Sequence, residues 1–190
     1  MKFIYRLSLL VALVTLSACA QRGAAPYAER YVAALERYPG EMQSDHRSID
    51  AFVRYFSGRQ EGETALAAKD LYAPMLYFSD TLLTSEDHDV VVAHLERMHE
   101  NTGGVDVTVL DTQIDGPDVY VIWRMQARFR PVRKEVLSDT IGATHLRFDR
   151  DGRIVLQQDF WDSTEGFYRH LPVVGSLVDY VAAGFASDAR

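Results

Sequence analysis

The strongest constraint on the fold is a segment from Val119 to Phe129 whose side chains alternate between apolar and polar. Such alternation predicts a β-strand of an antiparallel sheet, with one face on a core and the other toward water. The apolar face carries Val121, Trp123, Met125, Ala127 and Phe129. Turn residues separate this strand from three further strand-like runs, namely Val105–Leu110, Val136–Phe148 and Arg153–Trp161. The second half of the chain is therefore predicted to be an antiparallel meander.

The first half shows mostly helical spacing of apolar residues. Ile49, Phe52, Val53 and Phe56 predict one amphipathic helix, and the periodic residues of 87–99 predict another. Shorter helices are expected over Tyr27–Tyr38 and Thr64–Lys69, and a final one over Pro172–Phe185. The run Leu71–Phe78 resembles a strand, in which Pro74 belongs at an edge or a bulge. Helices followed by a curved antiparallel sheet predict an α+β fold.

The N-terminus has the pattern of a processed leader. Lys2 and Arg6 precede an apolar stretch from Leu7 to Leu16, which is too short to span a bilayer comfortably. The stretch ends in Leu16-Ser17-Ala18-Cys19, which is similar to the lipobox of bacterial lipoproteins, and Cys19 is the only cysteine. This resemblance implies cleavage before Cys19 and lipid on that residue, so that the membrane is a partner through the anchor. Ala20 after the cysteine favours the outer membrane, with the domain facing the periplasm.

Composition limits the number of domains and the partners. The chain has 190 residues, 47% of them hydrophobic and 25% charged, as in an ordinary folded protein with one core. The net charge of -7 is spread without a long basic run, so nucleic acid is not an expected partner. We expect a signal peptide at 1–18, a lipidated tether at 19–43, a domain at 44–162 and a helical extension at 163–190.

The order of elements, the Phe148–Ile154 turn region and the terminal Gln158-Asp159-Phe160-Trp161-Asp162 resemble the nuclear transport factor 2-like superfamily, nearest its SnoaL-like branch. The resemblance covers roughly residues 44–162. It implies a cone in which a curved antiparallel sheet wraps around helices and encloses an apolar pocket, with the C-terminal helix as an addition. The superfamily includes ketosteroid isomerase, polyketide cyclases, limonene epoxide hydrolase and domains without known chemistry, so the fold alone does not determine function.

The same resemblance indicates candidate site residues. Asp159 matches the pocket aspartate that limonene epoxide hydrolase and the polyketide cyclases use in acid–base chemistry. Tyr77 and Ser79 match positions that hold the attacking water in the epoxide hydrolase. That enzyme also needs an arginine and a second aspartate, where this chain has Trp123 and Met125. The epoxide hydrolase triad is therefore not intact.

Physical chemistry suggests how these residues would act. A carboxyl group in an apolar pocket has a raised pKa and can serve as a general base, and hydroxyl donors can stabilise an enolate-like oxygen. Asp159 is the candidate base, and Tyr55, Tyr77 and a protonated Asp80 are candidate donors. Strict alternation places Asp159 on the face opposite Ile154, Leu156 and Phe160, so a pocket-facing Asp159 requires a β-bulge near Gln157. Other pocket candidates are Ser79, Trp123, Met125, Trp161 and His145, of which the last either lines the pocket or faces water.

No metal site or organic cofactor is expected. His88, His94 and His99 are spaced six and five residues apart, which does not align them on one helix face, so we expect solvated side chains. Three functions remain open. The first is the binding of a small hydrophobic molecule, and the second is a cofactor-independent isomerase, cyclase or hydratase that uses Asp159. The third is envelope scaffolding by a homodimer formed through the outer sheet face.

Overall fold

The computed structural model describes residues 25–41, 46–57, 67–101, 105–131 and 135–186. The predicted leader, Cys19 and the first part of the tether lie outside these ranges. Of the described residues, those from 35 to 186 belong to one compact unit and those from 25 to 34 to another. The predicted helix over Tyr27–Tyr38 is observed as α2, Tyr27–Arg37. Within the described ranges, no helix is both long and apolar enough to cross a membrane.

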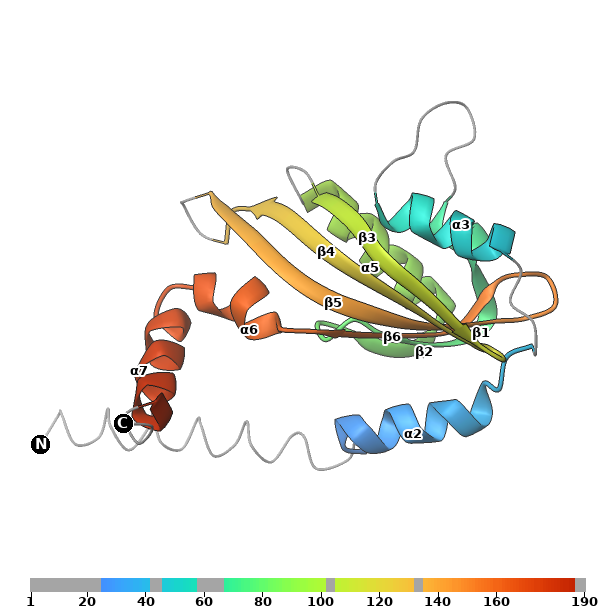
Figure 1. Cartoon of the computed structure of the whole chain (residues 1–190), viewed down its shortest axis with the longest axis horizontal. Coiled ribbons are helices and arrows are strands. Elements are labelled where there is room, and N and C mark those ends of the chain that lie inside the picture. Colours follow the sequence, from blue (N-terminus) through green and yellow to red (C-terminus); the bar gives the residue numbers. More distant parts are fainter. Residues whose placement is uncertain (1–24, 42–45, 58–66, 102–104, 132–134, 187–190) are drawn as a thin grey trace, which may run out of the picture. The chain divides into compact units, whose positions relative to one another are not determined.

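Six strands of the described residues form one curved sheet in the order β2-β1-β6-β5-β4-β3 (Figure 1). Neighbouring strands are antiparallel except β1 and β6, which are parallel. The sheet is thus mixed: the predicted antiparallel arrangement is confirmed for four of its five strand pairs and differs at the β1–β6 pair. Parallel pairing needs a long connection, which the intervening elements provide. The strands are β1 (Tyr72–Ser79), β2 (Thr84–Asp87), β3 (Val105–Asp115), β4 (Asp118–Phe129), β5 (Val136–Phe148) and β6 (Ile154–Trp161).

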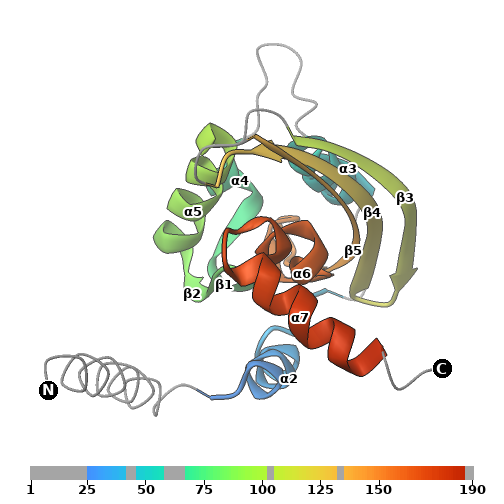
Figure 2. The same cartoon turned by 90° about the vertical axis from the view of Figure 1, so that its left-hand side faces the viewer.

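In the described residues after α2, three helices precede or interrupt the sheet, and three short or medium helices follow it. The predicted helices near residues 49–56 and 87–99 are confirmed, whereas β2, α6 and η1 were not predicted. Figure 2 shows the sheet arching, with α5 along one side and α6 at the near end. The helices are α3 (His46–Phe56), α4 (Ala68–Leu71), α5 (His88–Asn101), α6 (Ser163–Gly166), the 3-10 helix η1 (Tyr168–His170) and α7 (Val174–Ala186).

The core lies between the inner face of the sheet and the helices. The alternation predicted for β4 is confirmed, because Val119, Val121 and Trp123 are fully buried. Phe52 of α3 joins the same cluster, as do side chains of β1, β5 and β6. This core comes entirely from residues 49–161, so a chain that begins at residue 25 retains all of it.

A bulge in β6 decides which side chains face inward. Arg147 on β5 pairs with Leu156, whereas the next residue, Phe148, pairs with Ile154, so Val155 is an extra residue. A bulge of this kind shifts the alternation by one position. Asp159 therefore shares the inner face with Gln157, and Phe160 is exposed. The bulge near Gln157 that a pocket-facing Asp159 requires is present, at Val155.

Residues 35–41, which are part of the predicted tether, are bound to the outer face of the sheet. The guanidinium of Arg147 donates to the backbone carbonyls of Leu35 and Tyr38, at 2.7 and 3.1 Å. The amide of Glu41 donates to the carbonyl of Phe148 at 2.9 Å. These bonds hold residues 35–41 against the sheet.

The C-terminal extension begins at the end of β6. The Asp162 side chain accepts hydrogen bonds from the amides of Thr164 and Glu165 and so caps α6. The ring of Phe167 then stacks on Phe129 of β4, with centroids 5.7 Å apart. The predicted C-terminal helix is present as α7, and it exposes apolar side chains such as Leu177.

Candidate functional site

A cavity of about 700 Å³ opens between the inner face of the sheet and the helices. Its volume falls within the range of small-molecule pockets. Aromatic and aliphatic side chains provide most of the wall, from α3, α5, β1, β4, β6 and the segment after α6. The apolar lining residues include Phe52, Phe56, Phe78, Leu82, Leu95, Met98, Val105, Trp123, Met125, Ala127, Phe129, Trp161 and Phe167.

Asp159 provides a carboxyl group in this apolar surrounding. Its side chain lines the cavity and the residue is only 6% exposed. Burial raises its pKa to about 7; the hydrogen bond from Thr144 opposes the shift, the nearby charge of Asp80 adds to it, and the bond from Gln157 opposes it. Near neutral pH this carboxyl group can therefore both accept and release a proton.

Two hydrogen-bond relays hold Asp159. The indole of Trp123 donates to Thr144 Oγ1 at 2.9 Å, and Thr144 donates to Asp159 Oδ1 at 2.8 Å. Because the indole can only donate, the hydroxyl proton of Thr144 is directed at Asp159. In the second relay, the Tyr72 hydroxyl donates to Gln157 Oε1 at 2.6 Å, and Gln157 Nε2 donates to Asp159 Oδ1 at 3.1 Å. Both relays position the same carboxyl oxygen.

Asp80 lies at the end of β1 and also lines the cavity. Its Oδ1 accepts the amides of Leu82 and Leu83, and its Oδ2 lies 2.5 Å from His94 Nε2 of α5. Both carboxyl oxygens are thus engaged within the protein, which does not favour the expected role of Asp80 as a donor to a ligand. His94 is largely buried, in contrast to the solvated side chain expected for it.

The tyrosines divide between the two faces of the sheet. Tyr55 and Tyr72 line the cavity, and burial, with a smaller contribution from Glu96, raises the pKa of Tyr55 to about 12. Tyr77 is buried outside the cavity and donates to Gln158 Oε1 at 3.1 Å. The expected role of Tyr77 is corrected accordingly, because alternation along β1 gives the inner face to Tyr72 instead.

Ser79 and His145 also lie away from the cavity lining, which corrects their assignment to the pocket. Ser79 Oγ lies 3.0 Å from Thr84 Oγ1 on the neighbouring strand β2. His145 Nε2 lies 2.7 Å from Asp118 Oδ1, and its ring stacks on Tyr120. Burial lowers the pKa of His145, and Asp118 partly offsets this.

Trp123, Met125 and Trp161 line the cavity, as expected for pocket residues. The indole of Trp161 donates to the backbone carbonyl of Asp80 at 3.0 Å, so it ties the end of β6 to β1. Gly142 on β5 leaves room for the other indole, because a Cβ there would lie 2.4 Å from the Trp123 ring. A side chain at position 142 would displace the residue that begins the first relay.

Sequence reasoning missed four residues of this site. Gln157 shares the face of Asp159 by alternation, which is a usable signal once the bulge is known. Thr144, Tyr72 and His94 reach the site only through pairing with strands or helices distant in sequence, and no local pattern indicates that. No group of three metal-ligating side chains occurs in the part of the chain that the structure describes.

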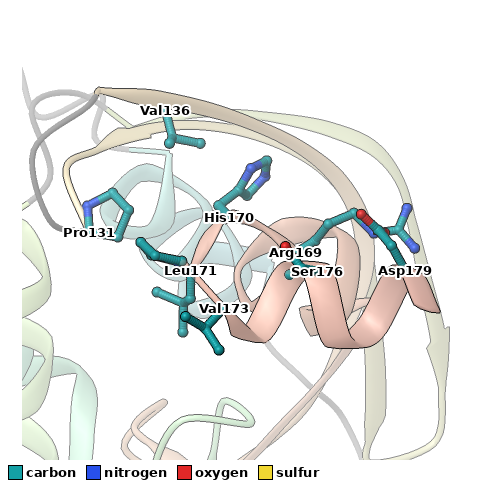
Figure 3. A pocket seen from close by; sticks show the side chains of 10 residues that line it. Pro131, Val136, Arg169, His170, Leu171, Val173, Ser176 and Asp179 are labelled. Atoms are coloured by element: carbon teal, nitrogen blue, oxygen red, sulfur yellow. The ribbon is translucent and has the colours of Figure 1, made fainter. Parts of the chain in front are cut away.

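A second, more open depression of about 430 Å³ lies beside η1 and the start of α7 (Figure 3). Arg169 of η1 and Asp179 of α7 lie next to each other there, with Nε and Oδ1 3.2 Å apart. Arg169 also pairs with Glu165 at 2.5 Å. The polar groups of this depression thus serve to join α7 to the preceding helices.

The curved sheet and the apolar cavity that it encloses have the nuclear transport factor 2-like fold. Residues 52–157 match the family described as the SnoaL-like domain, and the chain belongs to that family. No curated protein matches the chain significantly.

Solved structures support the fold. A SnoaL-like polyketide cyclase, so described, from Shewanella denitrificans has 21% identity and a TM-score of 0.53, covering 64% of this chain and 94% of its own. A protein with a ketosteroid isomerase-like fold from Catenulispora acidiphila, in complex with trimethylamine, has 17% identity and a TM-score of 0.52, covering 64% and 89%. An epoxide hydrolase of M. tuberculosis, described as LEH-like, has 19% identity and a TM-score of 0.50, covering 72% and 94%. At these identities the similarity shows the fold alone.

Proposed function

We propose that the domain binds a small, largely apolar molecule in the cavity, with a polar group of that molecule facing Asp159. The observation that carries the proposal is the single combination of an aromatic-lined cavity of about 700 Å³ and a carboxyl group buried in its wall. Apolar lining provides affinity, and a few placed polar groups provide orientation.

A second candidate function is cofactor-independent acid–base catalysis of the isomerase, cyclase or hydratase kind. It is favoured by the pKa of Asp159, which burial raises to about 7. The carboxylate would take a proton from a carbon next to a ligand carbonyl, leaving the C–H electron pair as an enolate, and then return the proton to carbon. Tyr55 lines the same cavity and keeps its proton at neutral pH, so it is the candidate donor to the enolate oxygen.

One probe tests both functions. Both tryptophans of the chain line the cavity, so quenching of their fluorescence by 1-decalone, an apolar bicyclic ketone, would report binding. Exchange of the α-hydrogens of 1-decalone in D₂O, followed by proton NMR, would report proton abstraction. We expect the Asp159→Asn variant to lose exchange and retain binding. The control is Asp139→Asn, on the outer face beside Arg124, which should behave as the unmodified chain.

The outcomes separate the candidates. If 1-decalone binds but its α-hydrogens exchange no faster than in buffer, the binding function is supported and acid–base catalysis of this kind is refuted. Exchange that persists in Asp159→Asn would reject Asp159 as the base. Absence of both binding and exchange would count against a cavity for apolar ketones.

We further propose that the domain acts at the cell envelope, tethered by lipid on Cys19. The support is the Leu16-Ser17-Ala18-Cys19 sequence after an apolar leader. Membrane fractionation of the chain labelled with a fatty-acid analogue tests it, with Cys19→Ala as the variant. Label that remains on the Cys19→Ala chain would refute the anchor.

A further inference from the structure

Among the described residues that line the cavity, Ser138 has a buried polar atom to which no role has yet been assigned. It lies on β5, is 1% exposed and lines the cavity. Its hydroxyl oxygen is buried, and no hydrogen-bond partner is found for it in the part of the chain that the structure describes. Native proteins pair nearly all such groups, since an unpaired buried hydroxyl costs stability. The exception therefore points to a ligand that would pair with it.

The position of Ser138 is far from Asp159. Asp159 pairs with Thr144 on β5, whereas Ser138 lies six residues earlier on the same strand and pairs with Ala127. At about 3.3 Å per residue, the two positions are about 20 Å apart along the strand. The small side chains of Ala127 and Ser138 leave space on the inner face, beside the stacked rings of Phe129 and Phe167.

The two ends of the cavity differ in charge. The carboxyl groups of Asp159 and Asp80 lie near each other at one end, where an anionic group would be repelled. At the other end the Ser138 hydroxyl can donate, and the exposed guanidinium of Arg130 lies at the rim. Between them the wall is apolar, with Trp123 and Met125 on β4.

We infer that the cavity takes an elongated apolar carboxylic acid whose carboxylate accepts a hydrogen bond from Ser138 and lies near Arg130. This inference rests on the proposed function, because it names the class of molecule that the same cavity binds. The apolar body of the ligand extends from this carboxylate toward Asp159, which the other polar group of the ligand faces.

The stability of the unliganded protein provides a first test. Ser138→Ala removes an unpaired buried hydroxyl, so the melting temperature of a chain that begins at residue 25 should rise. Ser79→Ala is the matched control, since that buried serine is bonded to Thr84 and its loss should lower the melting temperature. A lower melting temperature for Ser138→Ala would show that its hydroxyl is already bonded within the protein, which overturns the inference.

Binding provides the second test. Dodecanoate and dodecanol are titrated against the tryptophan fluorescence of the same chain. We expect dodecanoate to bind more tightly, and Ser138→Ala to weaken dodecanoate alone by about tenfold, as for one hydrogen bond to a charged group. Arg130→Gln should weaken dodecanoate mainly at low salt.

The result can separate this inference from the proposed function. If dodecanol binds and dodecanoate has no advantage in either protein, the cavity still binds apolar molecules and only the carboxylate inference is refuted. If neither probe binds while 1-decalone does, the elongated ligand is refuted and the proposed function stands. If dodecanoate, dodecanol and 1-decalone all fail to bind, the carboxylate inference and the proposed binding function are both refuted.

Discussion

The raised pKa of Asp159 makes the stability of the domain depend on pH, and Asp159→Asn should remove that dependence. In the folded protein burial raises the pKa of Asp159 to about 7, from the ordinary aspartate value of 3.8. Between these two pH values the folded state holds a proton that the unfolded state has lost. The free energy of unfolding therefore falls as the pH rises from about 4 to about 7, and is highest at the acidic end of this range.

The size of the effect follows from the pKa. At pH 5 the folded carboxyl group is about two pH units below its pKa, whereas the unfolded one is already ionised. At pH 8 both are ionised. Because each unit corresponds to about 1.4 kcal/mol, this group should account for a loss of about 2.5 kcal/mol between pH 5 and pH 8. Asparagine does not titrate, so the Asp159→Asn chain should lack this loss.

Urea unfolding at pH 5, 6, 7 and 8, on a chain that begins at residue 25, measures the difference between the two proteins. The control is Asp139→Asn. Hydrogen bonds from Arg124 and Gln126 lower the pKa of Asp139 to about 2, so this carboxyl group is ionised in both the folded and the unfolded chain from pH 5 to pH 8. Its pH dependence should match that of the unmodified chain. If the free energies of Asp159→Asn and the unmodified chain differ by the same amount at all four pH values, the argument that burial raises the pKa of Asp159 is refuted.

Three further predictions concern the relays and the packing around the cavity. Tyr72→Phe removes the donor to Gln157 and should destabilise the fold by about 1–3 kcal/mol, measured by urea unfolding; an unchanged midpoint would exclude that relay. Gly142→Ala brings a Cβ against the Trp123 ring and should cost about 1–3 kcal/mol and shift the tryptophan emission, whereas an unchanged spectrum would contradict the contact. Arg147→Ala frees two backbone carbonyls before α3 and should speed amide hydrogen exchange there, and unchanged exchange would show that the arginine does not hold the segment.

The regular parts of the sheet could be predicted because their side chains obey a simple period. β4 was expected at Val119–Phe129 and is observed at Asp118–Phe129, since every second residue of it meets the core. The β1–β6 pairing was not predictable in the same way. Nothing in the sequence of either strand specifies a parallel neighbour that lies about eighty residues away, and the short strand β2 carries polar residues without a clear period.

The candidate site was predictable only in part, because it depends on contacts between distant elements. Asp159 could be singled out, but its face could not, since alternation and resemblance gave opposite answers. Of the two tyrosines on β1, the sequence prediction chose Tyr77 and not Tyr72, and only the geometry of β1 places Tyr72 inside. His94 was expected in solvent because the spacing of residues along a helix says nothing about neighbouring loops. In the structure His94 contacts Asp80, in the loop after β1.

The bulge at Val155 connects the fold with the chemistry. Without the extra residue, regular alternation would direct Gln157 and Asp159 to the outer face and Phe160 to the inner face, which is the arrangement that hydrophobic burial alone favours. The observed strand does the reverse and leaves Phe160 exposed. Exposing a phenylalanine and burying a carboxyl group both oppose stability. The two relays from Trp123 and Tyr72 offset part of this cost, and both end at the carboxyl group that the bulge brings inside. The bulge therefore lowers local stability, and the hydrogen bonds that offset this cost all lead to Asp159. A role for the Asp159 carboxyl group in the cavity explains this arrangement best.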